Sequence, residues 1–346
     1  MSTRLTRRVR RSVLAVIGAT ALALLLPTAS ATATALDRSG TVGALASPVD
    51  VYMKDHPSDI GLQPHNFNPI SESPDIKVCP TAIECSVSQN PIIGQRNYIF
   101  IKLRNPGPYG SGTMEQGEIH VYRTTPGGGT TWPTQWTEIG WMAVPVYSGV
   151  TTVVIPWDNV PGPGHFCLLA RWLSANDPMT FEGPSTSVNT RNNNNVAWRN
   201  VSSVLLTPGR PQTRPFAIGN VLAEPTRNSL VFTEVAEPLE NAGGRLVVDL
   251  GPTLFERWVE GGMAGEGIRE VGRNQVEIVE PAKARLDGLV LMGGERLTMQ
   301  LQFTATTPTE KPISIRVTQF GPDVDGNERA DLGGVRYDVT VSKRDQ

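Results

Sequence analysis

The chain has 346 residues, with 34 glycines, 28 prolines and a formal net charge of −2. Abundant glycine and proline, with few long amphipathic helical patterns, predict short strands joined by many turns. The absence of excess positive charge argues against a nucleic-acid-binding protein, because such binding depends on a basic surface.

Residues 1–31 follow the three-part pattern of a cleavable secretory signal peptide. Five arginines and no acidic residue precede an apolar run over 13–26, and small residues then offer cleavage sites that end at Ala31, Ala33 or Ala35. A membrane anchor is the alternative, but a spanning helix needs about 20 apolar residues and this run is shorter. We therefore expect a secreted, extracellular protein with no membrane span in the mature chain.

Cleavage changes the charge of the protein. The five arginines of the signal peptide are lost from 31 basic residues, whereas all 33 acidic residues remain, which leaves a net charge of about −7. A mildly acidic protein is not expected to bind nucleic acid or anionic lipid.

The mature length of about 315 residues predicts two domains. Residues 32–50 are small and polar, and we expect a flexible leader there. Residues 51–206 show the alternation of apolar and polar side chains that predicts a β-sandwich, for example over 97–104. Residues 207–215 contain three prolines, which predict a stiff linker between domains.

Residues 216–346 are predicted to form a second β-sandwich. Seven strand candidates occur within this stretch, and they are interrupted by a short helix predicted over 253–259. Proline just before this helix and glycine just after it follow the usual asymmetry of helix ends. The predicted fold class is therefore all-β, with two sandwiches.

The three cysteines allow more than one pairing. Cys79 and Cys85 are the candidates for a disulfide, because an oxidising compartment would let them close a small loop. Cys167 lies in an apolar run and reads as a buried hydrophobic residue, although a bridge from Cys167 to one of the others is the alternative. No spacing of cysteines and histidines suggests zinc.

One acidic segment resembles part of a calcium loop. Oxygen-bearing side chains alternate along it, at Asp323, Asp325, Asn327 and Asp331. The segment lacks part of the calcium-loop pattern. It joins two clear strands and contains an Asp-Gly pair, so a hairpin turn is the favoured interpretation. We expect no cofactor, and calcium binding by this segment is the alternative.

No catalytic constellation is evident among the four histidines. Two of them, His56 and His65, flank a turn-rich segment that also holds Asp55 and Asp59. A metal cluster is one reading of this segment, and turn bonding by these side chains is the favoured one. Nucleophilic catalysis needs a nucleophile, a base and an orienting group, and no motif places these together.

Six of the seven tryptophans lie in the first predicted domain. Core packing is the favoured role for most of them, because a large aromatic side chain commonly fills a sandwich core. Trp132, Trp136 and Trp141 lie in a stretch rich in proline, threonine and glycine, so they are the candidates for exposure and for contact with a glycan or a protein partner.

Several phrases of the first domain resemble a known family. They include Asn97-Tyr-Ile-Phe-Ile-Lys-Leu-Arg-Asn-Pro-Gly107, Trp132-Pro-Thr-Gln-Trp136 and Gly164-His-Phe-Cys-Leu-Leu-Ala-Arg-Trp172. Together they resemble the immunoglobulin-like, CARDB-type (cell-adhesion-related) modules of secreted bacterial proteins, over residues 51–206. The resemblance implies an immunoglobulin-like sandwich and an adhesion role, and it carries no catalytic residues.

These observations predict a secreted, non-catalytic binding or adhesion protein of unknown ligand, not an enzyme, whose partner is an extracellular protein or glycan. The alternative is a secreted hydrolase, or a hydrolase accessory module, with acidic side chains in an interdomain cleft. A pocket holding carboxylates of raised pKa would favour that alternative.

Overall fold

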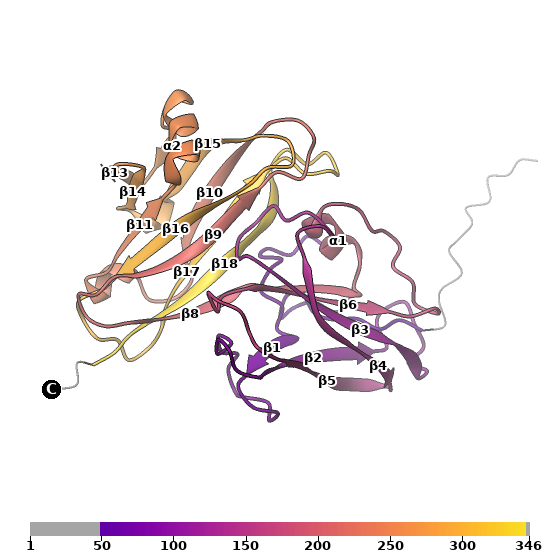
Figure 1. The fold of residues 1–346 in the computed structure, drawn as a ribbon. Helices are drawn as coiled ribbons and strands as arrows, with labels where there is room; N and C mark the ends of the chain where they lie inside the picture. Colours follow the sequence, from indigo (N-terminus) through magenta and orange to yellow (C-terminus); the bar gives the residue numbers. More distant parts are fainter. Residues whose placement is uncertain (1–48, 344–346) are drawn as a thin grey trace, which may run out of the picture. The chain divides into compact units, whose positions relative to one another are not determined.

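The structure is a computed structural model that describes residues 49–343 (Figure 1). The predicted signal peptide and nearly all of the predicted leader lie outside the described residues. Within 49–343, no helix is long and apolar enough to cross a membrane.

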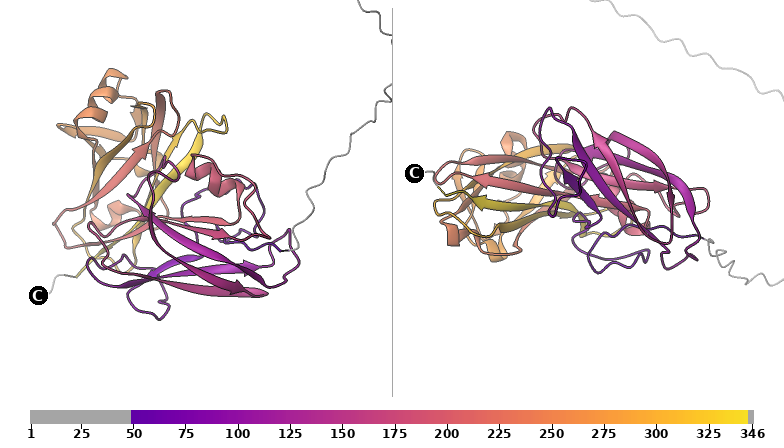
Figure 2. Two further views of the ribbon diagram at one scale, coloured as in Figure 1. Left: turned by 45° about the vertical axis from the view of Figure 1, so that its right-hand side comes forward. Right: turned by 90° about the horizontal axis from the view of Figure 1, so that it is seen from below.

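The all-β fold class predicted from the sequence is confirmed, since the described chain consists of two β-sandwiches (Figures 1 and 2). In the first sandwich, a sheet of order β1-β2-β5 packs against a sheet of order β4-β3-β6-β7. Its elements are β1 (Ile76–Cys79), β2 (Asn97–Asn105), β3 (Glu115–Thr124), β4 (Thr137–Val146), β5 (Gly149–Trp157), β6 (Cys167–Leu173), α1 (Thr186–Asn192) and β7 (Val196–Arg199).

The predicted alternation over 97–104 explains how strand β2 packs. Ile99, Ile101 and Leu103 are fully buried between the two sheets, whereas Lys102 and Arg104 between them are partly exposed. Trp172 and Ile119 from the opposite sheet complete this core. Burying such side chains contributes roughly 1.5–3 kcal/mol each, so the alternating strands stabilise the sandwich directly.

The second sandwich pairs a sheet of order β12-β15-β10-β17-β18-β8 with a sheet of order β13-β14-β11-β16-β9. Its strands and α-helix are β8 (Val201–Leu206), β9 (Gln212–Gly219), β10 (Thr226–Glu234), β11 (Arg245–Asp249), α2 (Gly251–Glu260), β12 (Gly265–Glu266), β13 (Ile268–Gly272), β14 (Gln275–Ile278), β15 (Arg285–Leu291), β16 (Arg296–Thr304), β17 (Ile313–Gly321) and β18 (Ala330–Val341). Two short 3-10 helices, η1 (Leu239–Ala242) and η2 (Pro281–Lys283), lie between strands.

The one helix predicted in this region is present as α2 and is slightly longer than expected. It begins at Gly251 rather than 253, because Pro252 fits the first turn of a helix, where its missing N–H costs no hydrogen bond. Leu254 and Trp258 form its buried face, and the helix packs against β15 and β16. The short helix α1 of the first sandwich was not predicted. It begins after Ser185, whose hydroxyl accepts a hydrogen bond from the amide of Val188.

The boundary between the sandwiches differs from the predicted one. Residues 196–206 were expected to be one strand of the first domain, but β8 pairs in parallel with β18 and so belongs to the second sandwich. The break falls at Asn200, whose side chain donates to the carbonyl oxygens of Gly334 and Gly127. A pairing across more than a hundred residues leaves no local pattern in the sequence.

The predicted linker over 207–215 is also shorter than expected, since β9 begins at Gln212. Only 207–211 connects β8 to β9, with a turn in which the amide of Arg210 donates to the carbonyl of Thr207. Pro215 lies within β9, and β9 is at the edge of its sheet, where a residue without an N–H is tolerated. Proline in this stretch therefore marks an edge strand rather than an interdomain linker.

The described residues belong to one compact unit, and polar contacts join its two sandwiches. Glu72 of the first sandwich accepts hydrogen bonds from Arg316 at 2.6 Å and from Arg336 at 2.9 Å. Arg296 at the start of β16 donates to the carbonyl oxygens of Gly128 at 2.6 Å and Thr125 at 3.0 Å. Strand β16 of the second sandwich is thereby hydrogen-bonded to the loop between β3 and β4 of the first sandwich.

Replacing Arg296 with methionine is expected to lower the free energy of unfolding by about 2 kcal/mol, because the partners in the 125–130 loop lose charge-assisted hydrogen bonds while the aliphatic packing is kept. Denaturant unfolding measures the effect. Arg227→Met is the matched control, because Arg227 is exposed on β10 and is expected to change stability by less than about 0.5 kcal/mol. Equal stabilities of the two variants would contradict a structural role for Arg296.

Candidate functional site

One face of the sheet β4-β3-β6-β7 carries the features of a binding site. Along β3, Ile119 and Val121 point into the core and are fully buried, so Glu118, His120 and Tyr122 point to the opposite face. The strand register places His120 opposite Trp141 of β4 and Arg171 of β6. Pairing across the sheet thus gathers side chains that are more than 20 residues apart in the sequence.

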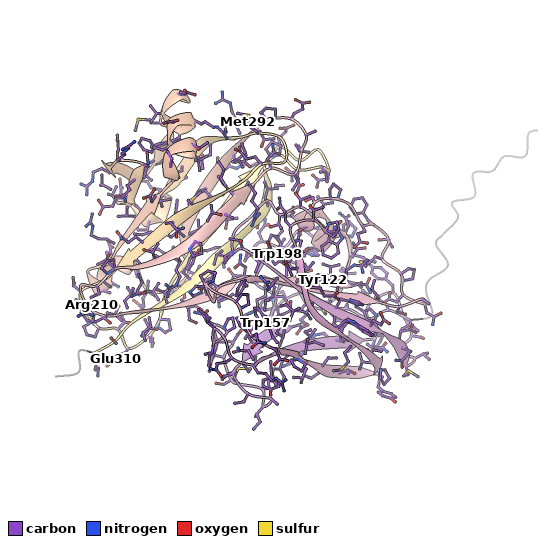
Figure 3. The ribbon with its side chains drawn as sticks, viewed as in Figure 1. Tyr122, Trp157, Trp198, Arg210, Met292 and Glu310 are labelled. Atoms are coloured by element: carbon purple, nitrogen blue, oxygen red, sulfur yellow. A yellow bond between two sulfur atoms is a disulfide. The ribbon has the colours of Figure 1, made fainter. Side chains whose placement is uncertain are left out.

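Four aromatic side chains form a continuous row on this face, which we call the aromatic row: Trp141, His120, Tyr122 and Trp132. The ring of His120 lies 5.7 Å from the ring of Trp141 and 6.4 Å from that of Tyr122, in near-parallel orientations. Trp132 meets Tyr122 edge-on, with centroids 5.0 Å apart. Tyr122 is labelled in Figure 3 on strand β3. The row offers apolar ring surface held in place by the sheet.

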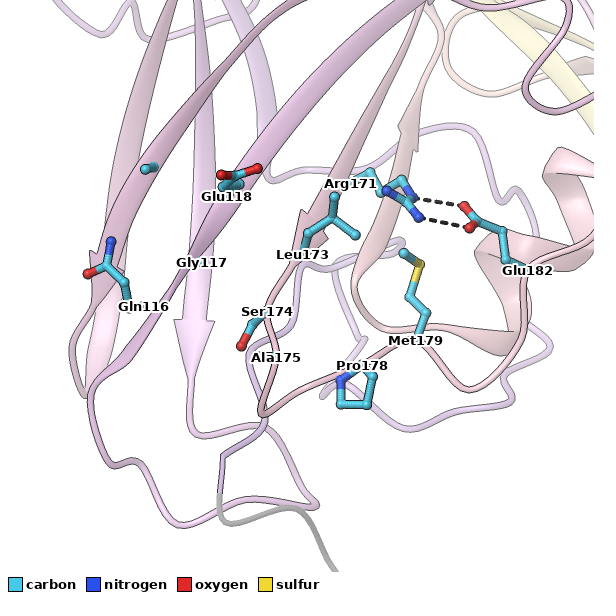
Figure 4. A pocket seen from close by; sticks show the side chains of 11 residues that line it. Gln116, Gly117, Glu118, Arg171, Leu173, Ser174, Ala175, Pro178, Met179 and Glu182 are labelled. Carbon is cyan, nitrogen blue, oxygen red and sulfur yellow. Dashed lines mark hydrogen bonds and ion pairs between the residues drawn. The ribbon is translucent and has the colours of Figure 1, made fainter.

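A hollow of about 560 Å³ lies on the same face, and Figure 4 shows the side chains that line it. Two of its lining residues contact the aromatic row, since Glu118 contacts His120 and Arg171 lies over Trp132. Its sheet side is formed by Glu118 of β3, Ala143 of β4 and Arg171 of β6, and its other side by the loop that holds Pro178 and Met179. The small side chains at Ala143, Ser174 and Ala175 leave this space unfilled. The volume falls within the range of about 300–1,000 Å³ that is usual for small-molecule sites.

Charged groups surround the hollow and the row. Arg171 forms a two-pronged ion pair with Glu182, with both N–O distances at 2.8 Å (Figure 4). The same guanidinium lies 5.8 Å from the ring of Trp132, over its face. Arg171 is thus oriented by the carboxylate of Glu182 and by the ring face of Trp132. The Glu182 carboxylate also neutralises its positive charge.

His120 is held between two carboxylates. Its Nδ1 lies 2.7 Å from Glu138 and its Nε2 lies 3.1 Å from Glu118. About half of the Glu118 side chain and 43% of the Glu138 side chain remain exposed. The two carboxylates therefore fix the imidazole ring within the row while presenting oxygen atoms to solvent.

The structure separates the three tryptophans that were predicted as exposed candidates. Trp141 is 55% exposed at the edge strand β4, and Trp132 is partly exposed in the row. The expectation for Trp136 is wrong, since it is only 8% exposed. Its ring packs edge-on against Trp198, and its Nε1 donates to Thr186 of helix α1, so a helix that was not predicted covers it.

The calcium candidates are arranged as a turn. The side chain of Asp325 accepts from the amide of Asn327, and the side chain of Asp331 accepts from the amide of Gly333. Asp323 accepts from the hydroxyl of Ser187. Within residues 49–343, no group of three His, Cys, Asp or Glu side chains is placed to hold a metal ion. The oxygen atoms of this segment bond the protein itself.

The histidine segment near the start of the first sandwich also forms local bonds. His65 Nε2 lies 3.0 Å from a carboxylate oxygen of Asp55, and both groups are buried. Asp59 accepts from the amides of Asp55 and Gly61, and His56 accepts from the amide of Ser58. Burial raises the pKa of Asp55 to about 7, against the opposing hydrogen bond from His65. The segment therefore contains a buried acid–histidine pair.

The predicted pairing of Cys79 with Cys85 is confirmed, and so is the prediction that Cys167 is a buried free residue. Cys79 and Cys85 form a disulfide at the end of β1. Cys167 is free and buried at the start of β6, and burial raises the pKa of its thiol to about 12. A thiol that stays protonated and has no access to solvent is chemically inert.

Sequence reasoning missed six residues of this face: Glu118, His120, Tyr122, Glu138, Arg171 and Glu182. The alternation over 118–122 indicated that Glu118 and His120 share a face with Tyr122. The register that brings β4 and β6 alongside them could not be read from local pattern.

No protein-family model and no curated protein sequence matches the chain. Solved structures with some likeness include a red sea bream transglutaminase, at 11% identity over 78% of this chain and TM-score 0.21. A collagen adhesin from S. aureus gives 8% identity over 77% of this chain and 92% of its own length, with a TM-score of 0.23. The CupB6 tip adhesin of Pseudomonas aeruginosa gives 10% identity, 78% and 99% coverage, and a TM-score of 0.17.

These likenesses are too weak to carry an argument about function. All three TM-scores lie below 0.5 and all three identities lie far below 25%. This chain also spans 31% of the transglutaminase chain's length.

Proposed function

We propose that this protein is a secreted, non-catalytic binding protein, and that the sheet face carrying the aromatic row binds a glycan. The observation that carries the proposal is the aromatic row with its adjoining hollow. Trp141 is 55% exposed although it is a large apolar side chain, and it stands beside a space that suits a small ligand.

Sugar rings have an apolar face of C–H groups and a rim of hydroxyl groups, and this face of the protein offers a counterpart to each. The exposed ring of Trp141 supplies apolar surface, and the partly exposed rings of Tyr122 and Trp132 extend it. Carboxylate oxygens of Glu118 and Glu138 and the amide of Gln116 supply acceptors and donors near the hollow. Aromatic anchors with a few polar groups around them are the usual composition of a small-ligand site.

The same contacts favour binding over catalysis. Glycoside hydrolysis needs one carboxylic acid to donate a proton and a second carboxylate to act as base or nucleophile. Here Glu182 is engaged by Arg171 and Glu118 by His120. Each carboxylate thus already contacts a protein group, so we propose neither a catalytic pair nor a cofactor, and the exposed part of Glu118 is left to accept hydrogen bonds from a ligand.

Export and family membership belong to the same proposal. The signal-peptide pattern of residues 1–31 supports an extracellular location. The phrases of residues 51–206 support a CARDB-type origin for the first sandwich, and its two packed β-sheets are compatible with that origin. Glycan binding at the cell surface or in the surrounding medium would be an adhesion function.

The proposal is tested by screening the mature chain on a glycan array and measuring the best ligand by calorimetry. Trp141→Ala is expected to weaken binding by about 30-fold or more, because a tryptophan at the centre of a contact commonly contributes 2 kcal/mol or more. The Tyr147→Ala variant is the matched control, since Tyr147 is an exposed aromatic residue (61%) in the turn between β4 and β5 and outside the aromatic row. It is expected to bind as the unmodified protein does.

Two results would contradict the proposal. One is a screen in which no glycan binds. The other is a glycan whose affinity is the same for the unmodified protein and the Trp141→Ala variant, because such a ligand would bind elsewhere. Release of shortened oligosaccharide during incubation would favour the alternative of a hydrolase.

A further inference from the structure

We propose that the glycan bound at the aromatic row carries free amino groups, and that Glu118 is the carboxylate that selects them, with Glu138 assisting. This inference rests on the proposed function and names the class of sugar. It is carried by the charge that the site leaves unmatched, by the placement of Glu118 at the hollow, and by the exposed ring of Trp141.

The charge balance of the face is negative whatever the protonation state of His120. Arg171 and Glu182 cancel each other in their two-pronged ion pair. Glu118 and Glu138 then share a single histidine between them. With a neutral imidazole the two carboxylates contribute two negative charges, and with a protonated imidazole one remains. A negatively charged ligand would be repelled, whereas an ammonium group would neutralise the remaining negative charge of the two carboxylates.

Glu118 is the better placed of the two carboxylates. It lines the hollow together with Ala143 and Arg171, and one of its oxygen atoms contacts His120. Because His120 holds that oxygen, the carboxylate is oriented, and its exposed part can accept hydrogen bonds from an ammonium group in the hollow. Glu138 contacts the other nitrogen of His120, on the far side of the ring from Glu118, and does not line the hollow.

The aromatic surface adds a second attraction for a positive charge. Tryptophan is the most favourable aromatic partner for a cation. Trp141 lies directly opposite His120 in the strand register, and Ala143, two residues farther along β4, lines the hollow. A chain of amino sugars could therefore place ring faces on the aromatic row and an ammonium group beside Glu118.

The inference is tested with sugar oligomers of similar length that differ in charge. Calorimetry of the mature chain would compare a short β-1,4-linked glucosamine oligomer, the same oligomer fully N-acetylated, and a uronic acid oligomer of similar length. We expect the glucosamine oligomer to bind at least about tenfold more tightly than its N-acetylated counterpart, with an advantage that shrinks at high salt. The uronic acid oligomer is expected to bind most weakly.

Isosteric variants assign the selectivity to residues. Glu118→Gln is expected to reduce the tenfold preference for the amine to about twofold or less, because affinity for the glucosamine oligomer falls much more than affinity for the N-acetylated oligomer. Glu138→Gln is expected to have a smaller effect of the same kind. Glu256→Gln is the matched control, because Glu256 is exposed on helix α2 of the other sandwich. It is expected to keep the full preference.

The outcomes separate this inference from the proposed function. If the N-acetylated or uronic acid oligomer binds as tightly as the glucosamine oligomer and Trp141→Ala weakens that binding, the amine inference fails and the glycan function stands. If an amine preference survives Glu118→Gln together with Glu138→Gln, the assignment to these carboxylates is overturned. If no oligomer or array glycan binds, both proposals fail.

Discussion

Replacing Gly127 with alanine is expected to destabilise the protein by about 3 kcal/mol or more, because no side chain fits at this position. Gly127 has φ of +147°, and it pairs with Ala217 of β9 in an isolated parallel bridge. A Cβ atom here would lie 1.8 Å from the carbonyl oxygen of Ala217. Because backbone atoms surround the site, relief would require the 125–130 loop to move away from the second sandwich.

The control for this prediction separates contact from backbone conformation. Gly209 also has a positive φ, of +75°, but nothing lies within 4 Å of the position its Cβ would take. Gly209→Ala is therefore expected to cost only about 1 kcal/mol. Denaturant unfolding monitored by tryptophan fluorescence measures both variants. Similar losses for the two would show that the approach of Gly127 to β9 is not tight.

The stability of the protein is expected to fall as the pH rises from 5 to 8, and the Asp55–His65 pair is expected to cause much of the fall. Burial raises the pKa of Asp55 to about 7 in the folded protein, from an ordinary value of 3.8. Between these values the folded state holds a proton that the unfolded state has released. The corresponding stability is fully present below pH 4 and is lost as the pH rises through 7.

Other titratable groups add to this pH dependence of the stability or oppose it. Burial also raises the pKa of Asp177, to about 6, so it adds to the loss. For His65, burial acts to lower the pKa, but the hydrogen bond and charge of Asp55 outweigh it, and the net direction is upward. Burial lowers the pKa of His165 to about 4, which contributes stability above pH 6.5 that is lost on acidification. Above pH 6.5 the contribution of His165 no longer changes, whereas the contributions of Asp55 and His65 still fall.

A single variant isolates the contribution of Asp55. Asp55→Asn keeps the size of the side chain and removes its titration, so it should gain stability relative to the unmodified protein by an amount on the order of 2 kcal/mol between pH 5 and 8. Asp158→Asn is the control. The pKa of Asp158 is lowered by its hydrogen bond with Arg96, so that group is charged throughout this range and its removal should have no pH-dependent effect. A pH profile of Asp55→Asn parallel to that of the unmodified protein would contradict this account.

Features set by local sequence were predicted well. The alternation of Ile99, Ile101 and Leu103 predicted a strand with one face in the core, because side-chain direction along a strand has a period of two. Helix α2 was predicted from Pro252 and the glycines after Glu260, because these residues act on the backbone within one turn. Both signals lie within a few residues of the structure that they determine.

Features that depend on distant pairing were not predicted. Strand β8 joins the second sandwich through parallel pairing with β18, and the prolines after it were mistaken for a linker. Trp136 was expected at the surface because its neighbours are polar, yet helix α1 and Trp198 cover it. The binding face itself depends on the register of β4 and β6 against β3, which no local pattern encodes.

The central claim is that a glycan binds on the aromatic row, and mapping the ligand by nuclear magnetic resonance tests it most directly. Titration of the labelled mature chain with the best array ligand should shift the indole N–H signal of Trp141 and the backbone signals of Glu118, His120 and Arg171. The signals of Trp157 and Phe166, which pack together in the core between the two sheets, should stay in place. Shifts confined to residues outside the aromatic row and the hollow would contradict the claim.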